Sequence, residues 1–258
     1  MDITDINKKK IIWSTDYFGN ATPYYPIKIP SVSTVISETV PDPEIEEFIR
    51  KMGKEKAEQI MQAAMYRGTA MHTFIENFVK NYAKTKDVSE SLSFTQTESV
   101  KQLLEQKIPE IKINEGRELF YKFYYSEYSN KYTDLIGCES PLWSPTLFYR
   151  GKADVIYKDN IYGLSVTDYK TGSDYVKKGS VKELKYKLQL GSYGNALDEM
   201  YKERNVKVNK ASILCVSTKS DILQEIECVG AELEEYKEKF KTLCKEYHIK
   251  NKTEFLLQ

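Results

Sequence analysis

The stretch from Gly151 to Gly172, GKADVIYKDNIYGLSVTDYKTG, combines two apolar strand patterns with charges that a buried sheet does not normally hold. Residues two apart in a strand point to the same face, so Val166, Asp168 and Lys170 share a face. A carboxylate in a half-buried position is costly unless a cation satisfies it. That cation could be Lys170, or it could be a metal ion with Asp154 as a second oxygen ligand.

The connection between the two strands decides whether Asp154 and Asp168 can act together. A two-residue turn at Asp159 and Asn160 would place the two carboxylates on opposite faces, whereas an odd-numbered loop or a bulge would place them on the same face. We predict the odd loop, against a moderate signal for the plain hairpin. Taken alone, the three charged residues fit a simpler interpretation, in which Asp154 ends a strand and Asp168 pairs with Lys170 on the surface.

The composition indicates a folded globular protein. The chain has 258 residues, of which 41% are hydrophobic, and this is enough for one large domain or one and a half. Lys plus Arg and Asp plus Glu both number 38, which does not suggest a general nucleic-acid coat but leaves room for a local basic groove.

Other sequence signals exclude several classes of site and location. None of the four cysteines pairs as CxxC, so we expect neither a zinc site nor an iron–sulfur cluster. No apolar run is long enough to span a membrane, and the N-terminus resembles neither a signal peptide nor a transit peptide. These patterns predict a soluble cytoplasmic protein without a membrane partner.

Hydrophobic periodicity predicts a helical first half and a mixed second half. The expected helices are 32–39, 44–84, 98–128 with a break near Pro109, 182–204 and 232–247, and the expected strands are 136–143, 151–157, 161–169, 211–217 and 222–228. The order predicts an α/β (or α+β) fold with a mixed sheet. An N-terminal helical portion, residues 1–130, would pack on a core formed by residues 131–258.

Three further features agree with a metal site, although each alone fits ordinary packing. His72 and Glu76, in RGTAMHTFIE, are four residues apart and therefore on one side of a helix. Gln189 and Tyr193, in QLGSY, have the same spacing. Glu139, in GCESPLW, lies on the strand before Asp154.

The ordered set G-x-x-x-H, E, G-x-x-D, D-x-K and Q-x-x-x-Y resembles the PD-(D/E)XK nuclease superfamily, and within it the RecB-like exonuclease branch. The segments PSVSTV, GTAMH, CESPLW, GKAD, VTDYKT and LQLGSY are similar to the mitochondrial genome maintenance exonucleases and their phage and bacterial relatives. The likeness spans about residues 30–245 and implies a restriction-endonuclease-like mixed sheet flanked by helices. The first Asp follows GKA rather than Pro, and the missing transit peptide favours a phage or bacterial setting.

The resemblance also implies roles for particular residues. Mg²⁺ or Mn²⁺ would be held by His72, Asp154, Asp168 and the backbone carbonyl of Tyr169, and no iron–sulfur cluster is implied. Lys170 would orient the attacking water, Gln189 would hold Lys170 or a substrate phosphate, and Tyr193 would support the site. The resemblance thus implies a catalytic group of Asp154, Asp168, Lys170, Gln189, Glu139 and Tyr193. Glu76 would support the metal ligands without binding the metal itself.

The substrate path has weaker signals. Five lysines crowd the connection after the D-x-K strand and could follow phosphates, although a solvated loop face explains them equally well: Lys177, Lys178, Lys182, Lys185 and Lys187. Trp13, Tyr24 and Tyr25 could stack on unpaired bases, but packing is the simpler explanation.

These observations predict a metal-dependent DNA exonuclease that prefers single-stranded ends and serves replication, repair or recombination. A single-strand-binding or annealing protein could be its partner. The alternatives are a double-strand-specific recombination exonuclease, a structure-selective endonuclease, an RNA-cleaving relative, and a non-catalytic DNA-binding module.

Overall fold

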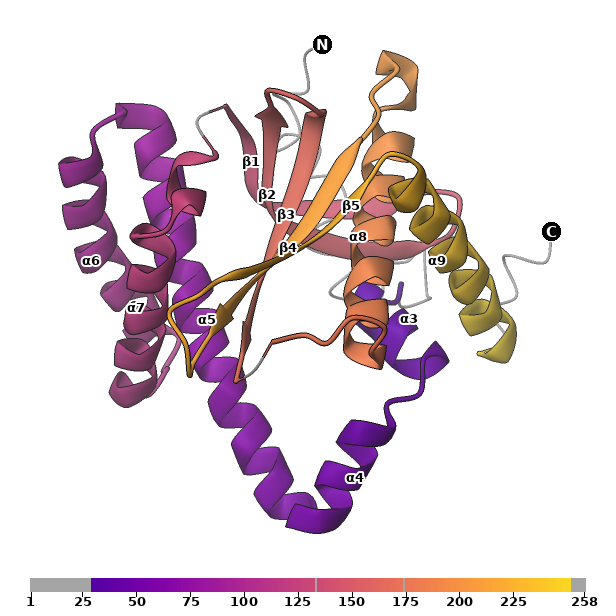
Figure 1. Ribbon diagram of the computed structural model, residues 1–258, viewed down its shortest axis with the longest axis horizontal. Coiled ribbons are helices and arrows are strands. Elements are labelled where there is room, and N and C mark those ends of the chain that lie inside the picture. Colours follow the sequence, from indigo (N-terminus) through magenta and orange to yellow (C-terminus); the bar gives the residue numbers. More distant parts are fainter. Residues whose placement is uncertain (1–28, 133, 174, 252–258) are drawn as a thin grey trace, which may run out of the picture.

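A computed structural model describes residues 29–132, 134–173 and 175–251 and contains a five-stranded mixed sheet (Figure 1). The strands lie side by side in chain order: β1 (Leu135–Ser144), β2 (Tyr149–Asp159), β3 (Gly163–Gly172), β4 (Lys210–Ser217) and β5 (Gln224–Val229). Only β3 and β4 run parallel, because α8 crosses between them, and the other neighbours are antiparallel.

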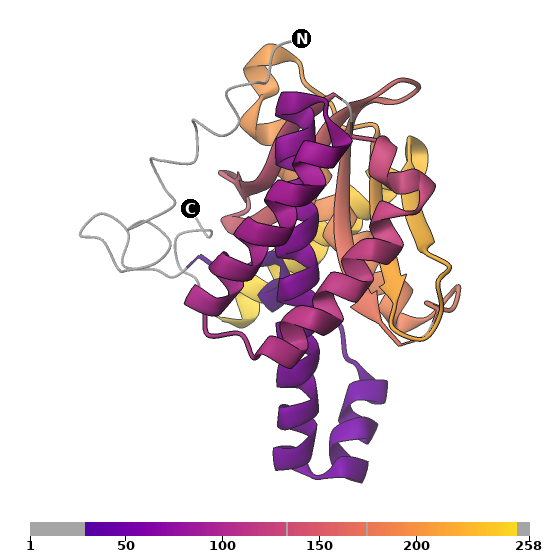
Figure 2. The ribbon, with the colours of Figure 1, turned by 90° about the vertical axis from the view of Figure 1, so that its left-hand side faces the viewer.

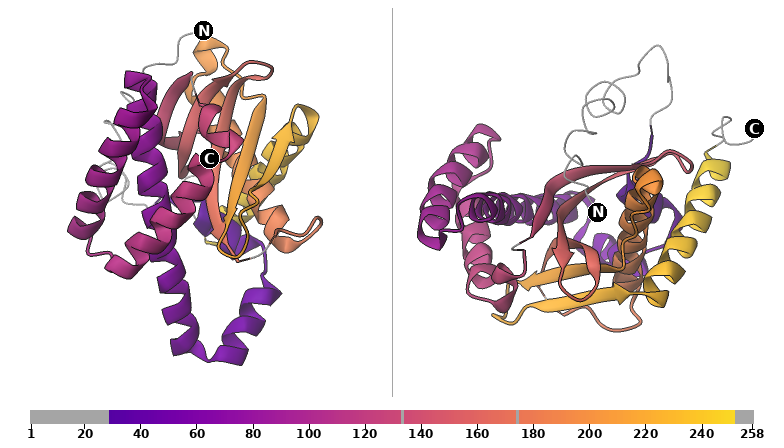
Figure 3. Two further views of the ribbon diagram at one scale, coloured as in Figure 1. Left: turned by 60° about the vertical axis from the view of Figure 1, so that its left-hand side comes forward. Right: turned by 90° about the horizontal axis from the view of Figure 1, so that it is seen from above.

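Helices cover both faces of this sheet (Figures 1 and 3). They are α3 (Val32–Thr39), α4 (Pro43–Met52), α5 (Lys54–Thr85), α6 (Val88–Glu105), α7 (Glu110–Tyr124), α8 (Val181–Met200) and α9 (Ala231–Lys250), with short 3₁₀ helices η2 (Glu127–Asn130) and η3 (Lys202–Arg204). The predicted mixed sheet flanked by helices, a restriction-endonuclease-like α/β fold, is confirmed.

The long helix expected over 44–84 is two helices. Gly53 has φ of +78°, a conformation that side-chain-bearing residues rarely adopt, and it ends α4 and begins α5. Asp42 caps α4 by accepting the Ile45 N–H, and Pro43 stands in its first turn. The sequence therefore makes a helical hairpin where periodicity alone suggests continuous helix.

Two apolar cores lie on the two faces of the sheet. One joins the inner faces of α3, α8 and α9 to residues such as Val166 and Ile213, and the other joins α5, α6 and α7 to residues such as Tyr169 and Leu214. Each core contains residues from both sides of position 130. The two cores therefore do not separate at residue 130, and the division of the chain at that position stays a prediction.

The β2–β3 connection has the odd length that the functional interpretation requires. Asp159 pairs with Gly163, which leaves a loop of residues 160–162. The Asp159 carboxylate stabilises this loop by accepting the N–H groups of Ile161 and Tyr162 at 2.8 and 3.0 Å. The prediction of an odd loop is confirmed, and it places Asp154 and Asp168 on one face.

The two strands separate directly after this hairpin. Pairing between β2 and β3 ends at Val155 and Thr167, whereas β2 continues beside β1 as far as Tyr149 and β3 continues beside β4 as far as Gly172. Figure 3 shows β1 and β2 curving away from the other strands. The sheet therefore forks, and Asp154 and Asp168 are the first residues of its two branches.

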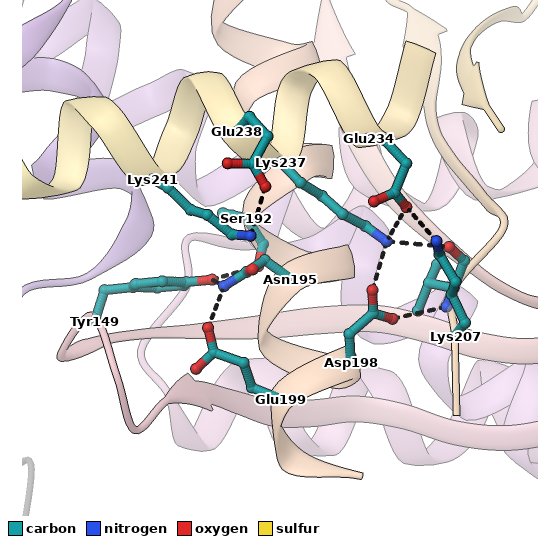
Figure 4. Close-up of polar contacts among 11 residues, drawn as sticks. Tyr149, Ser192, Asn195, Asp198, Glu199, Lys207, Glu234, Lys237, Glu238 and Lys241 are labelled. Carbon is teal, nitrogen blue, oxygen red and sulfur yellow. Dashed lines mark hydrogen bonds and ion pairs between the residues drawn. The ribbon is translucent and has the colours of Figure 1, made fainter. Parts of the chain in front are cut away.

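The helix pair α8–α9 fixes one wall of this fork. A Cβ on Gly191 would lie 2.4 Å from the backbone of Tyr236, so glycine permits the helices to approach closely. Nearby, the buried Lys237 ammonium bridges Asp198 at 2.6 Å and Glu234 at 2.8 Å (Figure 4). A buried ammonium with two carboxylate partners is satisfied, and it ties α9 to α8.

Candidate active site

A cleft of about 730 Å³ opens at the fork of the sheet. Its walls come from α3, α5, the three strands β1 to β3, and α8, and one residue comes from the connection between α6 and α7. The polar residues that line it include Ser31, Ser33, Thr69, His72, Thr73, Glu76, Gln106, Glu139, Arg150, Lys152, Asp154, Asp168, Lys170, Gln189 and Tyr193. Most of the residues singled out in the sequence are thus brought together.

Asp154 stands at the base of the cleft and is 6% exposed. Its Oδ2 accepts the backbone N–H of Tyr169 at 2.6 Å, a donor that becomes available because β2 has left β3. The same oxygen lies 3.3 Å from Nδ1 of His72, which α5 carries into the fork. One carboxylate therefore joins both strand branches to α5.

Asp168 is held from the other side, by α8. Its Oδ1 accepts two hydrogen bonds, one from Nε2 of Gln189 at 3.0 Å and one from the Tyr193 hydroxyl at 3.3 Å. The Lys170 ammonium lies 2.6 Å from Oδ2, but this buried oxygen has no partner in hydrogen-bonding geometry. Gln189 thus holds Asp168, whereas the sequence interpretation had it holding Lys170 or a phosphate.

The Tyr193 ring approaches the site because residue 151 has no side chain. A Cβ at Gly151 would lie 2.9 Å from Cε1 of Tyr193 and 3.3 Å from Val32. The glycine in GKAD therefore has a packing reason, since it lets α8 and α3 close on β2.

The proximity of the carboxylates controls their protonation. Burial and the neighbouring Asp154 carboxylate raise the pKa of Asp168 to about 6. Burial opposes ionisation of Asp154 as well, but the charges of His72 and Lys170 and the Tyr169 N–H lower its pKa. Two buried carboxylates on one face thus repel each other, and a divalent cation between them would relieve the repulsion.

The basic groups respond in the opposite sense. Burial alone would lower the pKa of His72, but the Asp154 carboxylate outweighs it and raises that pKa. Burial would likewise lower the pKa of Lys170, and the Asp168 and Asp154 carboxylates raise it instead. Both groups carry positive charge more readily because the fork is acidic.

His72, Glu139 and Asp154 form a donor set that suits a metal ion. One ligand atom from each lies within 4.8 Å of the others. Glu139 reaches this position with φ of +51°, an unusual backbone for a strand residue that is not glycine. Its carboxylate also pairs with Lys152, and burial together with Asp154 raises its pKa. The carboxylate oxygens and the imidazole fit a hard divalent cation.

Other predicted residues are less directly placed. Glu76 lines the cleft but forms an ion pair with Lys80. The role of the Tyr169 carbonyl as a ligand stays a prediction. The absence of an iron–sulfur cluster, which would need cysteine ligands, also stays a prediction. All four cysteines are buried. Trp13, Tyr24 and Tyr25 lie outside the described residues.

None of the five predicted phosphate-binding lysines lines the cleft. Lys185 pairs with Asp42, and Lys187 pairs with Glu183 and Glu232. A role for Lys177, Lys178 and Lys182 in binding phosphates stays a prediction.

Sequence reasoning overlooked two cations that do line the cleft, Arg150 and Lys152. They precede Asp154 by four and two residues on β2, so the alternation of a strand puts all three on one face. That alternation, visible in RGKAD, was the signal that could have found them.

Comparison with known proteins decides the family. The sequence model described as "PD-(D/E)XK nuclease superfamily" matches residues 47–255, a range that contains His72 and all the charged residues that line the cleft. This chain belongs to the PD-(D/E)XK nuclease superfamily. Nucleases of this superfamily use divalent metals and act on DNA, which agrees with the acidic fork and its histidine.

Among solved structures, this chain is similar to a "Putative exonuclease" from Eubacterium rectale. The identity is 16% and the TM-score is 0.41, over 67% of this chain and 66% of that one, so the chain spans just under two thirds of that protein. No curated protein matches the chain. In the described part of this chain, we find no helix with the length and apolar character needed to cross a bilayer.

Proposed function

We propose that this nuclease is a metal-dependent DNA exonuclease that hydrolyses phosphodiester bonds from free ends, with a preference for single strands. The observation that carries the proposal is the fork, which brings Asp154, Asp168 and Lys170 into one cleft beside His72. These are acidic and basic groups of the kind that phosphodiester hydrolysis uses, and both carboxylates are buried.

His72, Glu139 and Asp154, whose ligand atoms lie within 4.8 Å of one another, would hold Mg²⁺ or Mn²⁺. Asp168 and the Tyr169 carbonyl, which the sequence resemblance also implies, would be further ligands. A divalent cation bound there would polarise the scissile phosphate and lower the pKa of a coordinated water. Oδ2 of Asp168 lies 2.6 Å from the Lys170 ammonium, so a cation bound beside Asp168 would share this oxygen with Lys170.

Lys170 would act on the attacking water and on the charge that develops at phosphorus. Its ammonium is held 2.6 Å from Asp168, and the acidic surroundings keep it protonated. Gln189 and Tyr193 act as positioning residues, because both hold Oδ1 of Asp168 and leave Oδ2 to the Lys170 ammonium. Glu76 would support the ligand group from α5.

Arg150 and Lys152 are the strongest candidates for contacts to the DNA backbone. They line the cleft on the same strand face as Asp154, so a strand that reaches the carboxylates would pass them. Lys177, Lys178, Lys182, Lys185 and Lys187 would contribute a more distant positive field.

The preference for single-stranded ends rests on the walls of the cleft. α3 lies on one side and α5 on the other, and α4 joins them beyond the sheet (Figures 1 and 2). A duplex is wider than a single strand and would have to displace these helices. We place the activity in replication, repair or recombination in a bacterial or phage-infected cytoplasm, with a single-strand-binding or annealing protein as partner.

The test uses DNA labelled at either end, as single strands, duplexes and closed circles, with Mg²⁺, Mn²⁺ or EDTA. We expect rapid release of label from linear single strands, slower release from duplexes, and no release in EDTA. Preferential digestion of duplexes would favour the recombination exonuclease, and efficient cutting of circles would favour the endonuclease. Binding without cleavage under any metal would refute the enzymatic proposal.

A further inference from the structure

Lys152 forms an ion pair with one of the candidate metal ligands. Its ammonium contacts Oε2 of Glu139, and Glu139 belongs to the group of three side chains whose ligand atoms lie within 4.8 Å of one another. The Lys152 side chain is 60% exposed, whereas that of Glu139 is 17% exposed. The pair therefore joins a shielded carboxylate of the cleft to a long side chain that lies mostly in water.

The pairing of β1 with β2 brings the two side chains together. Ser140 pairs with Ala153 in this antiparallel ladder. The residue before Ser140, Glu139, therefore stands opposite Asp154. Lys152 lies two residues before Asp154 and so on the same face of β2. A diagonal neighbour on the adjacent strand is within reach of a long side chain, and Lys152 contacts Glu139 in this way.

Three carboxylates hold the Lys152 ammonium. Burial would lower the pKa of Lys152, but Glu139, Asp154 and Glu76 raise it. Burial and the charge of Asp154 raise the pKa of Glu139, and the contact with Lys152 opposes them. The ammonium therefore neutralises part of the negative charge that a divalent cation at this site would neutralise.

An ammonium and a divalent cation on one carboxylate repel each other. A divalent ion binds carboxylate oxygens at about 2.0–2.6 Å, so contact of Lys152 with the same Glu139 carboxylate would place two positive charges a few ångströms apart. Lys152 has a flexible four-carbon stem and is mostly exposed, so it can leave Glu139 without any movement of the strands. Turned away from Glu139, the ammonium would point into the cleft that a DNA strand would enter.

We propose that Lys152 and the divalent metal ion are alternative partners of Glu139, so that metal binding releases Lys152 to a DNA phosphate. The inference deepens the proposed nuclease function and rests on the metal site assigned there. Because linkage is reciprocal, DNA that takes up Lys152 would in turn strengthen metal binding. Metal and DNA would then bind together, and either one alone would bind less well.

The first test measures Mn²⁺ binding by titration calorimetry in the absence of DNA. Lys152→Met removes the competing ammonium and should raise Mn²⁺ affinity about two- to fivefold, the factor of a partly exposed ion pair. Lys152→Arg keeps a cation on Glu139 and should stay near the wild type. In a Glu139→Gln background, Lys152→Met should have no effect, because the carboxylate for which the two cations compete is gone.

Lys80→Met is the matched control for this test. It also removes a cation, 48% exposed, from an ion pair with a carboxylate of the cleft, but that carboxylate, Glu76, is not one of the three grouped ligands. We expect it to change Mn²⁺ affinity less than Lys152→Met does. Equal gains in the two variants, or a gain from Lys152→Met that persists beside Glu139→Gln, would show a general effect of charge and overturn the proposal. A lower affinity in Lys152→Met would overturn it as well.

The second test measures binding of single-stranded DNA by fluorescence anisotropy, with Mn²⁺ and with EDTA. All proteins carry Lys170→Met, so that the DNA stays intact. We expect Mn²⁺ to raise DNA affinity in this background, and Lys152→Met to reduce that gain about two- to fivefold. Lys152→Arg should retain the gain. An equal gain with and without the Lys152 ammonium would overturn its release to DNA.

The outcomes separate this proposal from the proposed function. If the wild type binds Mn²⁺ but does not digest DNA, the exonuclease proposal fails, while the Mn²⁺ affinities still decide whether Lys152 competes for Glu139. If the wild type digests DNA but Lys152→Met leaves Mn²⁺ affinity unchanged, the exonuclease proposal stands and the competition is refuted.

Discussion

Asp168 interacts with most of the charged groups of the site. It contacts Lys170, Gln189 and Tyr193, it faces Asp154, and its pKa of about 6 reflects burial and the neighbouring carboxylate. The D-x-K pattern identified this residue from the sequence. Its partners on α8 could be named but not assigned to it, because the contact depends on how α8 packs after the crossover to β4.

Gln189 tests whether Asp168 is positioned from α8. Gln189→Leu removes the 3.0 Å donor to Oδ1, so the carboxylate should rotate and bind metal less well. We expect Mn²⁺ affinity, measured by titration calorimetry, to fall about 10- to 100-fold, as found when a group that orients a metal ligand is lost. Gln62→Leu, at an exposed site on α5, is the control, and equal affinity in both variants would contradict the assignment.

His248 makes the stability of the fold depend on pH. Its Nε2 lies 2.9 Å from the Leu147 carbonyl, and burial lowers its pKa below the ordinary 6.5. Because the unfolded chain binds the proton more readily, the stabilisation is present above pH 6.5 and is lost as pH falls towards the depressed pKa.

His248→Gln keeps a donor for Leu147 but removes this titration. We expect the Tm to fall less between neutral pH and about pH 5.5 in the variant than in the wild type. Both proteins are measured in EDTA, so that the titration of the fork is common to them. Parallel Tm profiles would show that His248 does not titrate in this range.

At the scale of elements, the sequence predicted the existence of the helices and strands better than their breaks. The odd β2–β3 loop followed from requiring Asp154 and Asp168 on one face, and Asp159 stabilises it locally. The break at Gly53 was not visible in apolar periodicity, because it is a local glycine conformation with open space around it. The φ of +51° at Glu139 was not visible either, because a single backbone dihedral leaves the apolar pattern unchanged. Contacts between distant elements, such as Asp42 with Lys185, leave no local signal.

The crossing of α8 and α9 makes a prediction at this scale. A Cβ at Gly191 would lie 2.4 Å from the Tyr236 carbonyl, so Gly191→Ala must move the helices apart. We expect it to lower the free energy of unfolding by about 1–3 kcal/mol. Gly68→Ala is the matched control, because its Cβ would have only an ordinary contact of 3.5 Å with Thr171. Urea denaturation that shows equal effects would contradict the proposed packing.

For the molecule as a whole, neutral composition conceals a strongly organised charge pattern. The 38 basic and 38 acidic residues cancel, yet the cleft concentrates Glu139, Asp154 and Asp168 at its base with Arg150 and Lys152 beside them. An acidic base suits a metal ion, and adjacent cations suit the phosphates that the metal would act on. Net charge therefore gave little indication of function. The order of the motifs and the fork of the sheet indicated where the charged groups gather.

The most direct test of the account measures cleavage and DNA binding together in wild type and Lys170→Met. With Mg²⁺ or Mn²⁺ and end-labelled single-stranded DNA, we predict that the variant loses cleavage by about 100- to 1,000-fold, as when one preorganised charge-stabilising group is removed. Its DNA affinity, measured by fluorescence anisotropy, should stay within a few-fold, and EDTA should abolish cleavage in the wild type. A variant that still cleaves at the wild-type rate, or wild-type cleavage that persists in EDTA, would contradict a metal-dependent nuclease site at the fork.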